Sequence, residues 1–245
     1  MGQQEGAVAP HYPTDPNHFE FDEGVARVFD DMAVRSLPGY ERAYQVIGHM
    51  AARSNFPHFT QVWDMGTSTG KGLSTIYAAM GLNPYIDYYG VDISAPMLER
   101  ALAKCPFATM LNHDLTKGMP EEMAHGEVGV VVFGWVLQFI QDTDTRAAIL
   151  RDAYSALTKG GFIAVMEKYN IPDQLLDGVM QDSYITMRRQ NGYTLDEIKA
   201  KNRALATAMW PAAPDWTTKV LTDAGADVHV LYRELNFGGI IAIKR

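Results

Sequence analysis

Residues 64–70 are the part of the sequence whose residue types best suit ligand chemistry. They read Asp-Met-Gly-Thr-Ser-Thr-Gly and follow the short apolar run 61–63. This pattern predicts a first strand that turns into a helix, with backbone N–H groups free to hold a ligand. Asp92 ends a second apolar run, 88–91, and an acid about 20–30 residues after a glycine-rich turn is the usual partner of a ribose. Together they predict a nucleoside-binding site.

The turn differs from the two glycine-rich motifs that bind phosphates. Lys71 lacks the Ser or Thr that follows the lysine of a phosphate-binding loop. Ser68 replaces the middle glycine of the dinucleotide fingerprint, so its side chain would crowd a pyrophosphate. The remaining groups suit a nucleoside without phosphate: Asp64 for an ammonium group, the backbone of 66–70 for a carboxylate and Asp92 for ribose hydroxyls. These are the polar parts of S-adenosylmethionine.

A further acid, Asp114, follows a weaker third strand at 109–112. From the end of that strand it can accept a hydrogen bond from the adenine amine, with Leu115 and Ile93 flanking the ring. The alternative is that Asp114 only caps the next turn. Its position after a third strand is what favours the binding role.

The composition is that of an ordinary globular protein. The 245 residues are 47% hydrophobic and 20% charged, which suits one large α/β domain. A net charge of -8 argues against a nucleic-acid partner. Cys105 is the single cysteine and the seven histidines are scattered, so we expect neither disulfides nor a metal site, and a cytoplasmic location. No signal peptide or run of about 18 apolar residues is evident, so no membrane association is expected.

Strand and helix patterns alternate along the chain. They predict an α/β, Rossmann-like fold with a seven-stranded sheet. Strands are expected at 62–65, 88–91, 109–112, 128–133 and 162–166, then as an antiparallel pair at 227–233 and 237–243. Helices are expected at 72–80, 95–102, 145–157 and 216–224. We expect Ser94 to cap the second of these helices and Lys159-Gly160-Gly161 to end the third.

Three segments lie outside this alternation. Residues 1–18 form either a flexible tail or a lid that orders over a ligand. The rest, 19–245, is expected to be one domain, in which 19–56 hold two helices, broken at Pro38-Gly39, as a cap over the sheet's carboxyl edge. Between 171 and 214 a mostly helical insertion is too long to be a simple crossover.

Several motifs extend the pattern beyond a generic nucleoside site. Asp-x-Gly-x-Ser-x-Gly, followed by Val-Asp-Ile-Ser-x-x-Met-Leu-Glu-Arg, resembles class I S-adenosylmethionine-dependent methyltransferases. Over nearly the whole chain after residue 19, other motifs resemble the carboxy-S-adenosylmethionine synthase family. They are Phe21-Asp22-Glu23, Arg35-Ser36-Leu37-Pro38-Gly39-Tyr40, Leu137-Gln138-Phe139, Glu167-Lys168, Asn191-Gly192-Tyr193 and Asn236-Phe237-Gly238.

The resemblance implies S-adenosyl-L-methionine as the cofactor. The residues that it implies for the nucleoside site are Tyr40, Gly66, Thr67, Ser68, Asp92, Ile93, Asp114 and Leu115. To these the residue pattern adds Asp64 and Gly70 in the turn, and Gly134 at the sulfonium end.

Two positions differ from that family. Gly134 stands where the family has an asparagine, and Asn202 stands where it has the arginine that holds the extra carboxylate on the sulfonium carbon. An asparagine cannot supply the roughly 1.5–3 kcal/mol of a hydrogen bond to a charged group, and Arg203 points about 100° around a helix. We therefore interpret the carboxylate site as lost. Carboxy-S-adenosylmethionine synthesis from S-adenosylmethionine and prephenate is the alternative, and a cofactor-binding protein without turnover is a further one.

The expected activity is methyl transfer to a nitrogen or oxygen of a small aromatic or heteroaromatic metabolite, such as azapteridines like toxoflavin. The small Gly134 beside Trp135 would leave room for such a planar acceptor, bound by a monomer or homodimer. Because the sulfonium is already activated, proximity and desolvation matter more than a strong base. Candidate bases are His11, Tyr12 and Tyr184. Candidate acceptor-site residues, of which the aromatic ones could instead belong to the core, are Phe19, Trp135, Phe139, Tyr193, Asn202, Trp210 and Trp216.

Overall fold

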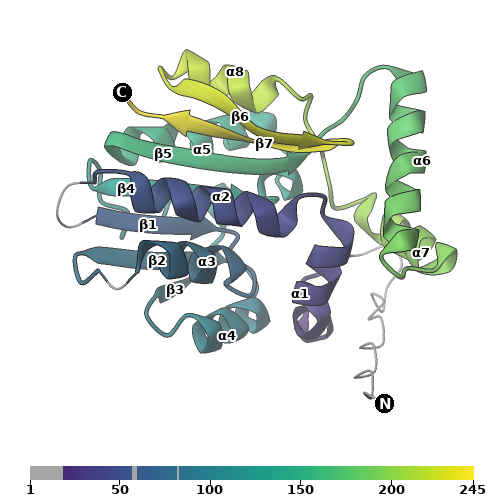
Figure 1. The fold of residues 1–245 in the computed structure, drawn as a ribbon, viewed down its shortest axis with the longest axis horizontal. Helices are drawn as coiled ribbons and strands as arrows, with labels where there is room; N and C mark the ends of the chain where they lie inside the picture. The colour runs from purple at the N-terminus through teal and green to yellow at the C-terminus, as the bar shows by residue number, and fades with distance from the viewer. Residues whose placement is uncertain (1–18, 57–59, 82) are drawn as a thin grey trace.

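A seven-stranded mixed sheet forms the centre of the computed structural model, which describes residues 19–56, 60–81 and 83–245 (Figure 1). The strand order is β3-β2-β1-β4-β5-β7-β6. β7 is antiparallel to both of its neighbours, and the other strands pair in parallel. The predicted α/β, Rossmann-like fold is thereby confirmed. The strands are β1 (Thr60–Met65), β2 (Ile86–Asp92), β3 (Thr109–Asn112), β4 (Val128–Gly134), β5 (Leu157–Lys168), β6 (Asp227–Glu234) and β7 (Phe237–Ile243).

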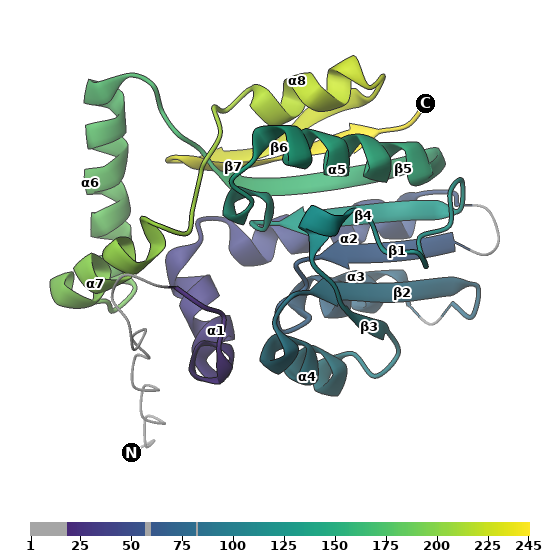
Figure 2. The same cartoon turned by 180° about the vertical axis from the view of Figure 1, so that it is seen from behind.

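The central strands are buried because helices cover both faces of the sheet. Side chains alternate along β4, so that Val130 and Val132 join one apolar cluster while Val131 and Phe133 join the other. On the first face lie α2 (Tyr40–Arg53) and α3 (Lys71–Met80), followed by α4 (Ala95–Lys104) near β3. The second face is covered by α5 (Thr143–Ala156) and α8 (Trp216–Asp223), as Figure 2 shows.

The two N-terminal helices have different positions, which corrects part of the prediction for 19–56. α1 (Glu23–Ser36) lies beyond the carboxyl ends of the strands, as expected of a cap, and Gly39 turns the chain with φ 73°. α2 does not belong to the cap. It buries Tyr44 and Ile47 on the sheet, and Gly48 lets it approach α3 closely. The reason is that its apolar face is wide enough to pack on a sheet.

The insertion 171–214 forms what we call the helical arm. It contains α6 (Gln174–Gln190) and α7 (Leu195–Leu205), and a capping box of Thr194 with Glu197 starts the second helix. In Figures 1 and 2 the arm stands off the end of the sheet beside α1. Polar and charged residues cover most of both helices, which explains why neither packs flat on the sheet.

The predicted role of Lys159-Gly160-Gly161 is wrong. α5 already ends at Ala156, and these three residues lie inside β5. Gly160 has φ 82°, and a Cβ on Gly161 would come within 2.9 Å of two carbonyl oxygens. The glycines therefore serve the register shift between β4 and β5 rather than a helix end. Within the described ranges, no helix has the length and apolar character needed to cross a membrane.

Candidate active site

One cavity of about 650 Å³ opens at the carboxyl ends of the strands, between the sheet, α1 and the helical arm. Residues predicted for a cofactor and for an acceptor meet in this same space. Those that line it are Phe19, Tyr40, Gly66, Thr67, Ser68, Asp92, Ile93, Asp114, Leu115, Gly134, Trp135, Phe139, Tyr184 and Asn202.

Asp92 is held in place by the backbone on both sides of its carboxylate. Ser68 N–H donates to Oδ2 and Ser94 N–H donates to Oδ1, each at 2.9 Å. Burial raises the pKa of Asp92, and the two N–H groups oppose that rise. Ser94 also caps α4 through its hydroxyl, as predicted. The carboxylate thus faces the cavity in a fixed orientation, with lone pairs left for a diol.

Gly66 is required by the close approach of the turn to the next loop. It has φ 74°, and a Cβ there would lie 2.5 Å from a methyl group of Val136. Ser68 also has a positive φ, 48°, which is uncommon outside glycine. These two conformations let the backbone of the turn line the cavity directly.

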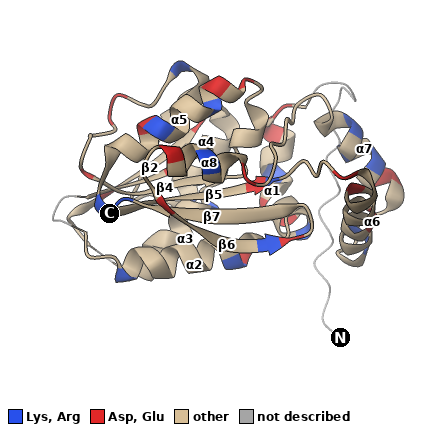
Figure 3. Ribbon diagram, turned by 90° about the horizontal axis from the view of Figure 1, so that it is seen from above, with Lys and Arg blue, Asp and Glu red and all other residues tan. Residues whose placement is uncertain are grey.

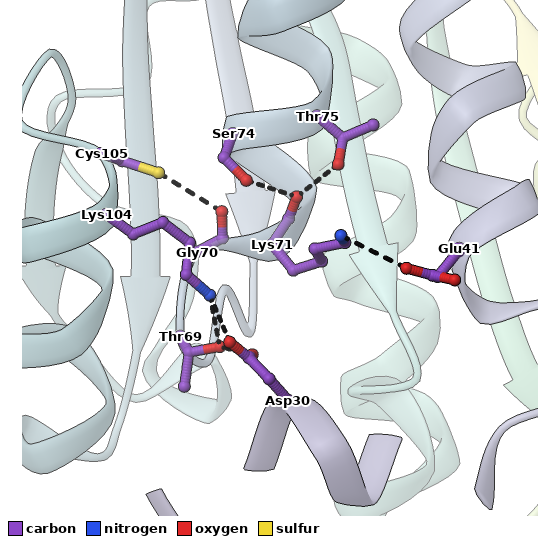
Figure 4. A network of polar contacts seen from close by, with 9 residues as sticks. All are labelled: Asp30, Glu41, Thr69, Gly70, Lys71, Ser74, Thr75, Lys104 and Cys105. Carbon is purple, nitrogen blue, oxygen red and sulfur yellow. Dashed lines mark hydrogen bonds and ion pairs between the residues drawn. The ribbon is translucent and has the colours of Figure 1, made fainter. Parts of the chain in front are cut away.

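The far side of the turn is anchored rather than exposed to the cavity (Figure 4). The Thr69 hydroxyl donates to Asp30 of α1, whose other oxygen pairs with Lys104 Nζ at 2.6 Å. The Gly70 carbonyl accepts from Cys105 Sγ at 3.3 Å. Gly70 does not line the cavity, so its predicted role in cofactor binding is wrong, and it instead positions the start of α3.

Asp64 also differs from its predicted role. It is fully buried and outside the cavity wall, and its Oδ2 accepts from the Thr67 hydroxyl at 3.0 Å. The N–H of Leu73 is a second donor. A Cβ on Gly72 would lie 2.5 Å from the same carboxylate oxygen. The carboxylate therefore lies beneath the loop rather than in the cavity wall, and its Oδ1 is buried without a hydrogen-bond partner among the described residues.

Burial raises the pKa of Asp64 from 3.8 to about 7, against the hydrogen bonds from Thr67 and Leu73. Because the folded protein binds this proton more tightly, the contribution to stability is complete below pH 4 and is lost as the pH rises through 7. Wild-type protein should therefore be less stable at pH 8 than at pH 5.5 by about 2 kcal/mol from this group. Urea unfolding at the two pH values measures the difference.

Asp64→Asn is the matched control, because the amide does not titrate. Its pH dependence should be smaller than that of the wild type by the same amount. An equal pH dependence in both proteins would contradict the raised pKa.

Asp114 caps the next turn, which was the alternative, and it also lines the cavity, so the predicted adenine contact stays a prediction. Its Oδ1 accepts from the N–H and the hydroxyl of Thr116, at 2.9 and 2.7 Å, and so caps the 3₁₀ helix Leu115–Lys117. These bonds lower its pKa. The same carboxylate lines the cavity, and Ile93, 65% exposed, provides an apolar surface nearby. This end of the cavity suits a flat, polar-edged ring.

Aromatic rings form another part of the cavity wall. Phe21 and Phe139 pack with ring centroids 5.2 Å apart, and Tyr40 lies 5.2 Å from Trp135. Trp135 has φ 55°, a strained conformation for a bulky residue, at the point where β4 ends. Aromatic rings of this kind exclude water and offer stacking surfaces.

The room expected beside Gly134 is already filled. A Cβ at this position would overlap the hydroxyl of Tyr44, which reaches over from α2. The glycine therefore accommodates Tyr44 rather than a planar substrate, which corrects the prediction. The Tyr44 side chain is 5% exposed, and its ring centroid lies 5.9 Å from that of Trp135. Tyr44 is therefore part of the base of the cavity.

Three predicted acceptor-site residues lie elsewhere, and these predictions are wrong. Tyr193 accepts from the Ser36 hydroxyl at 3.1 Å behind the wall. The backbone N–H of Trp210 donates to the carbonyl of Gln138. Trp216 packs against the apolar cluster on the sheet face that α5 and α8 cover. Aromatic residues serve as core or support as readily as pocket wall. The candidate bases His11 and Tyr12 lie outside the described residues.

Tyr184 lines the cavity, but its contacts do not suit a base. Its hydroxyl donates to the Ser36 carbonyl at 2.9 Å, and burial raises its pKa to about 12. A phenol of this kind stays protonated at neutral pH. Its ring instead supports the guanidinium of Arg188, whose central carbon lies 4.0 Å from the ring centroid.

Three basic residues of the cavity wall were not predicted: Lys168, Arg188 and Lys201. Arg188 is 2% exposed and donates from Nη1 to Oδ1 of Asn202 at 2.9 Å. Asn202 thus holds a guanidinium in the cavity wall, so a cation that the sequence analysis did not consider lies beside the position of the missing arginine. The spacing of Tyr184 and Arg188, four residues apart on one helix face, is the signal that indicates this pair.

Comparison with known proteins identifies the family of this chain. A methyltransferase domain family matches residues 63–163. Carboxy-S-adenosyl-L-methionine synthase of Helicobacter hepaticus is 32% identical over 231 residues, which cover 92% of this chain and 95% of that protein. The chain belongs to the carboxy-S-adenosyl-L-methionine synthase family.

Solved structures of methyltransferases are similar in fold to this member of the synthase family. An O-methyltransferase family protein from Burkholderia thailandensis has a TM-score of 0.62 at 16% identity, covering 91% of this chain and 60% of that one. Magnesium protoporphyrin IX methyltransferase from Synechocystis, with bound S-adenosylhomocysteine, has a TM-score of 0.57 at 15% identity, covering 89% and 87%. The fold is that of class I methyltransferases.

S-adenosyl-L-methionine is the cofactor of this family member, and the cavity fits it. Gly66 leaves the space that a Cβ would fill, and the oriented carboxylate of Asp92 can accept from both hydroxyls of a ribose. The capped carboxylate of Asp114 lies in the same wall, with apolar Leu115 beside it.

Proposed function

We propose that the protein transfers a methyl group from S-adenosyl-L-methionine to a nitrogen or oxygen of a small aromatic or heteroaromatic molecule. The observation that carries this proposal is the continuity of the cavity. Asp92, which suits a ribose, and the aromatic side chains of Phe139 and Trp135 all line this one cavity. The volume of about 650 Å³ lies in the range of small-molecule sites.

The residues of the chain would bind, orient and exclude water. Asp92 would hold the ribose and the backbone of 66–68 the methionine portion. Phe21, just before α1, and Phe139, in the 3₁₀ helix Leu137–Phe139, close the site. The bound cofactor supplies an already activated methyl group on a sulfonium sulfur. Proximity and desolvation then provide most of the acceleration, and no strong base is required.

A small-molecule acceptor agrees with the distribution of charge. Lys and Arg segments are interspersed with Asp and Glu segments around the ribbon in Figure 3. A nucleic-acid partner would favour clustered Lys and Arg, and the net charge of -8 points the other way. Azapteridines of the toxoflavin type belong among the acceptors to be tested, in forms that lack a methyl group, because they combine a planar ring with ring nitrogens that can accept one.

Carboxy-S-adenosyl-L-methionine synthesis is the second candidate. The name of the Helicobacter hepaticus relative favours it, and so does the buried guanidinium of Arg188 beside the cavity. Asn202 alone no longer counts against this activity, because it orients a cationic partner for a carboxylate.

Mass spectrometry distinguishes the two candidates. Protein is incubated with S-adenosyl-L-methionine that carries an isotopic label on the methyl group, with and without prephenate, and with a panel of heteroaromatic acceptors. The first proposal expects label on an acceptor together with S-adenosylhomocysteine. A heavier, carboxylated cofactor that forms only with prephenate would replace it with the second candidate.

A further inference from the structure

Positive charge is concentrated where the helical arm meets the cavity. Lys168 at the end of β5, Arg188 on α6 and Lys201 on α7 all line the wall. None of the three makes an ion pair within the part of the chain that the structure describes. Three cations thus gather in one wall with no carboxylate of the described residues at ion-pair distance, although the charge of Asp177 on α6 acts on Lys168 and partly offsets the lowering of its pKa.

Arg188 is the most buried of the three and the least satisfied. Only Nη1 has a hydrogen-bond partner, Oδ1 of Asn202 at 2.9 Å, whereas Nε and Nη2 are buried with none. Burying charged donors without partners is costly, so a protein retains such a group where a ligand completes it. Burial lowers the pKa of the guanidinium from its ordinary value, which agrees with an incomplete set of partners.

The two nitrogens without partners also determine which anion Arg188 can bind. Nε and Nη2 lie on one edge of the guanidinium, and that edge matches the two oxygens of a carboxylate through parallel hydrogen bonds. Tyr184 supports one face of the group, and Asn202 fixes its far corner. Both nitrogens are shielded from water, so a carboxylate must displace a neighbouring side chain to reach them.

Lys168 and Lys201 add positive charge to the part of the cavity wall that holds Arg188. Lys201 donates from Nζ to the Ser36 hydroxyl at 2.9 Å, and Lys168 Nζ lies 5.5 Å from the Tyr184 ring centroid. Burial lowers the pKa of both lysines, and repulsion from the charge of Arg188 lowers it further. A bound anion would relieve this repulsion for all three groups at once.

We propose that Arg188, oriented by Asn202 and assisted by Lys168 and Lys201, binds a carboxylate of the second substrate. The inference rests on the proposed function, since it assumes a second substrate beside the cofactor. It narrows the acceptor to planar molecules that carry a carboxylate on the side facing the arm.

The test uses the full chain loaded with S-adenosylhomocysteine, with benzoate as the probe and benzamide as its neutral counterpart. Calorimetry in a buffer free of carboxylate and phosphate should detect benzoate and not benzamide. Arg188→Met removes the fork and should weaken benzoate binding at least about tenfold, the effect of losing a charge-assisted contact. The matched control is Arg189→Met, an exposed neighbour on α6 outside the cavity, which should leave binding unchanged.

Asn202→Asp keeps the test valid if Arg188→Met fails to fold. It gives Arg188 a carboxylate partner within the protein, so it should preserve or increase thermal stability while benzoate binding falls. A purely structural role for Arg188 predicts no loss of binding in this variant. Equal benzoate binding in wild type, Arg188→Met and Asn202→Asp would overturn the proposal.

The affinity for S-adenosylhomocysteine separates this proposal from the proposed function. It should stay within about twofold in both variants, because the expected cofactor contacts come from the strand ends and not from α6 or α7. A parallel loss of cofactor affinity would assign the cluster to the cofactor and overturn the subsite. Wild-type protein that binds no S-adenosylhomocysteine would instead contradict the proposed function.

Discussion

Asp92→Ala is expected to weaken the binding of S-adenosyl-L-methionine by at least about 100-fold, because two hydrogen bonds to a charged group contribute about 1.5–3 kcal/mol each. The carboxylate is half-buried and already aligned by the N–H groups of Ser68 and Ser94, so no other side chain replaces it. Titration calorimetry of the purified variant measures the change directly.

Asp87→Ala is the matched control for that experiment. Asp87 lies on the same strand, β2, but is exposed and outside the cavity. Its replacement should leave cofactor affinity and fold intact. Thermal unfolding of both variants shows whether the loss at Asp92 reflects binding rather than unfolding, and wild-type affinity in Asp92→Ala would refute the ribose contact.

The second large effect is expected at Gly134. Gly134→Ala should lower the free energy of unfolding by about 1–3 kcal/mol, because the new methyl group overlaps the Tyr44 hydroxyl and the surrounding core must shift. Adding Tyr44→Phe removes that oxygen and should restore most of the loss. Urea unfolding of the wild type, both single variants and the double variant gives the coupling energy.

Gly178→Ala is a control in which replacing a glycine should raise the free energy of unfolding instead of lowering it. Gly178 lies within α6, and a Cβ there meets nothing within 4 Å. Alanine should stabilise the helix by up to about 1 kcal/mol. For the double-variant experiment, strictly additive changes in the free energy of unfolding would contradict the prediction, because they would show that the residue 134 methyl group and the Tyr44 hydroxyl do not compete for the same space.

The cofactor half of the site could be predicted from local sequence. Asp92 and Asp114 each end a strand, and strand ends meet at one edge of a parallel sheet whatever the rest of the fold does. Ser94 likewise caps α4 as its position before the helix indicates. Such inferences succeed because neighbours in the chain determine these positions.

Other positions depend on contacts between distant segments. Asp64 follows the expected pattern, yet its side chain turns beneath the loop because Gly72 and Leu73 receive it there. Asn202 alone indicates a lost charge, and only the packing of α6 against α7 reveals that it holds Arg188. The space at Gly134 depends in the same way on Tyr44, which lies 90 residues earlier in the chain.

The separation of the helical arm from the sheet has a consequence for how relatives diverge. The strand ends that hold the cofactor and the arm that supplies Tyr184, Arg188 and Asn202 are different stretches of the chain. Substitutions within one contiguous segment of the gene can therefore change which molecule is accepted while the donor site is inherited unaltered. A lineage built in this way acquires new chemistry without passing through ancestors that have lost their cofactor.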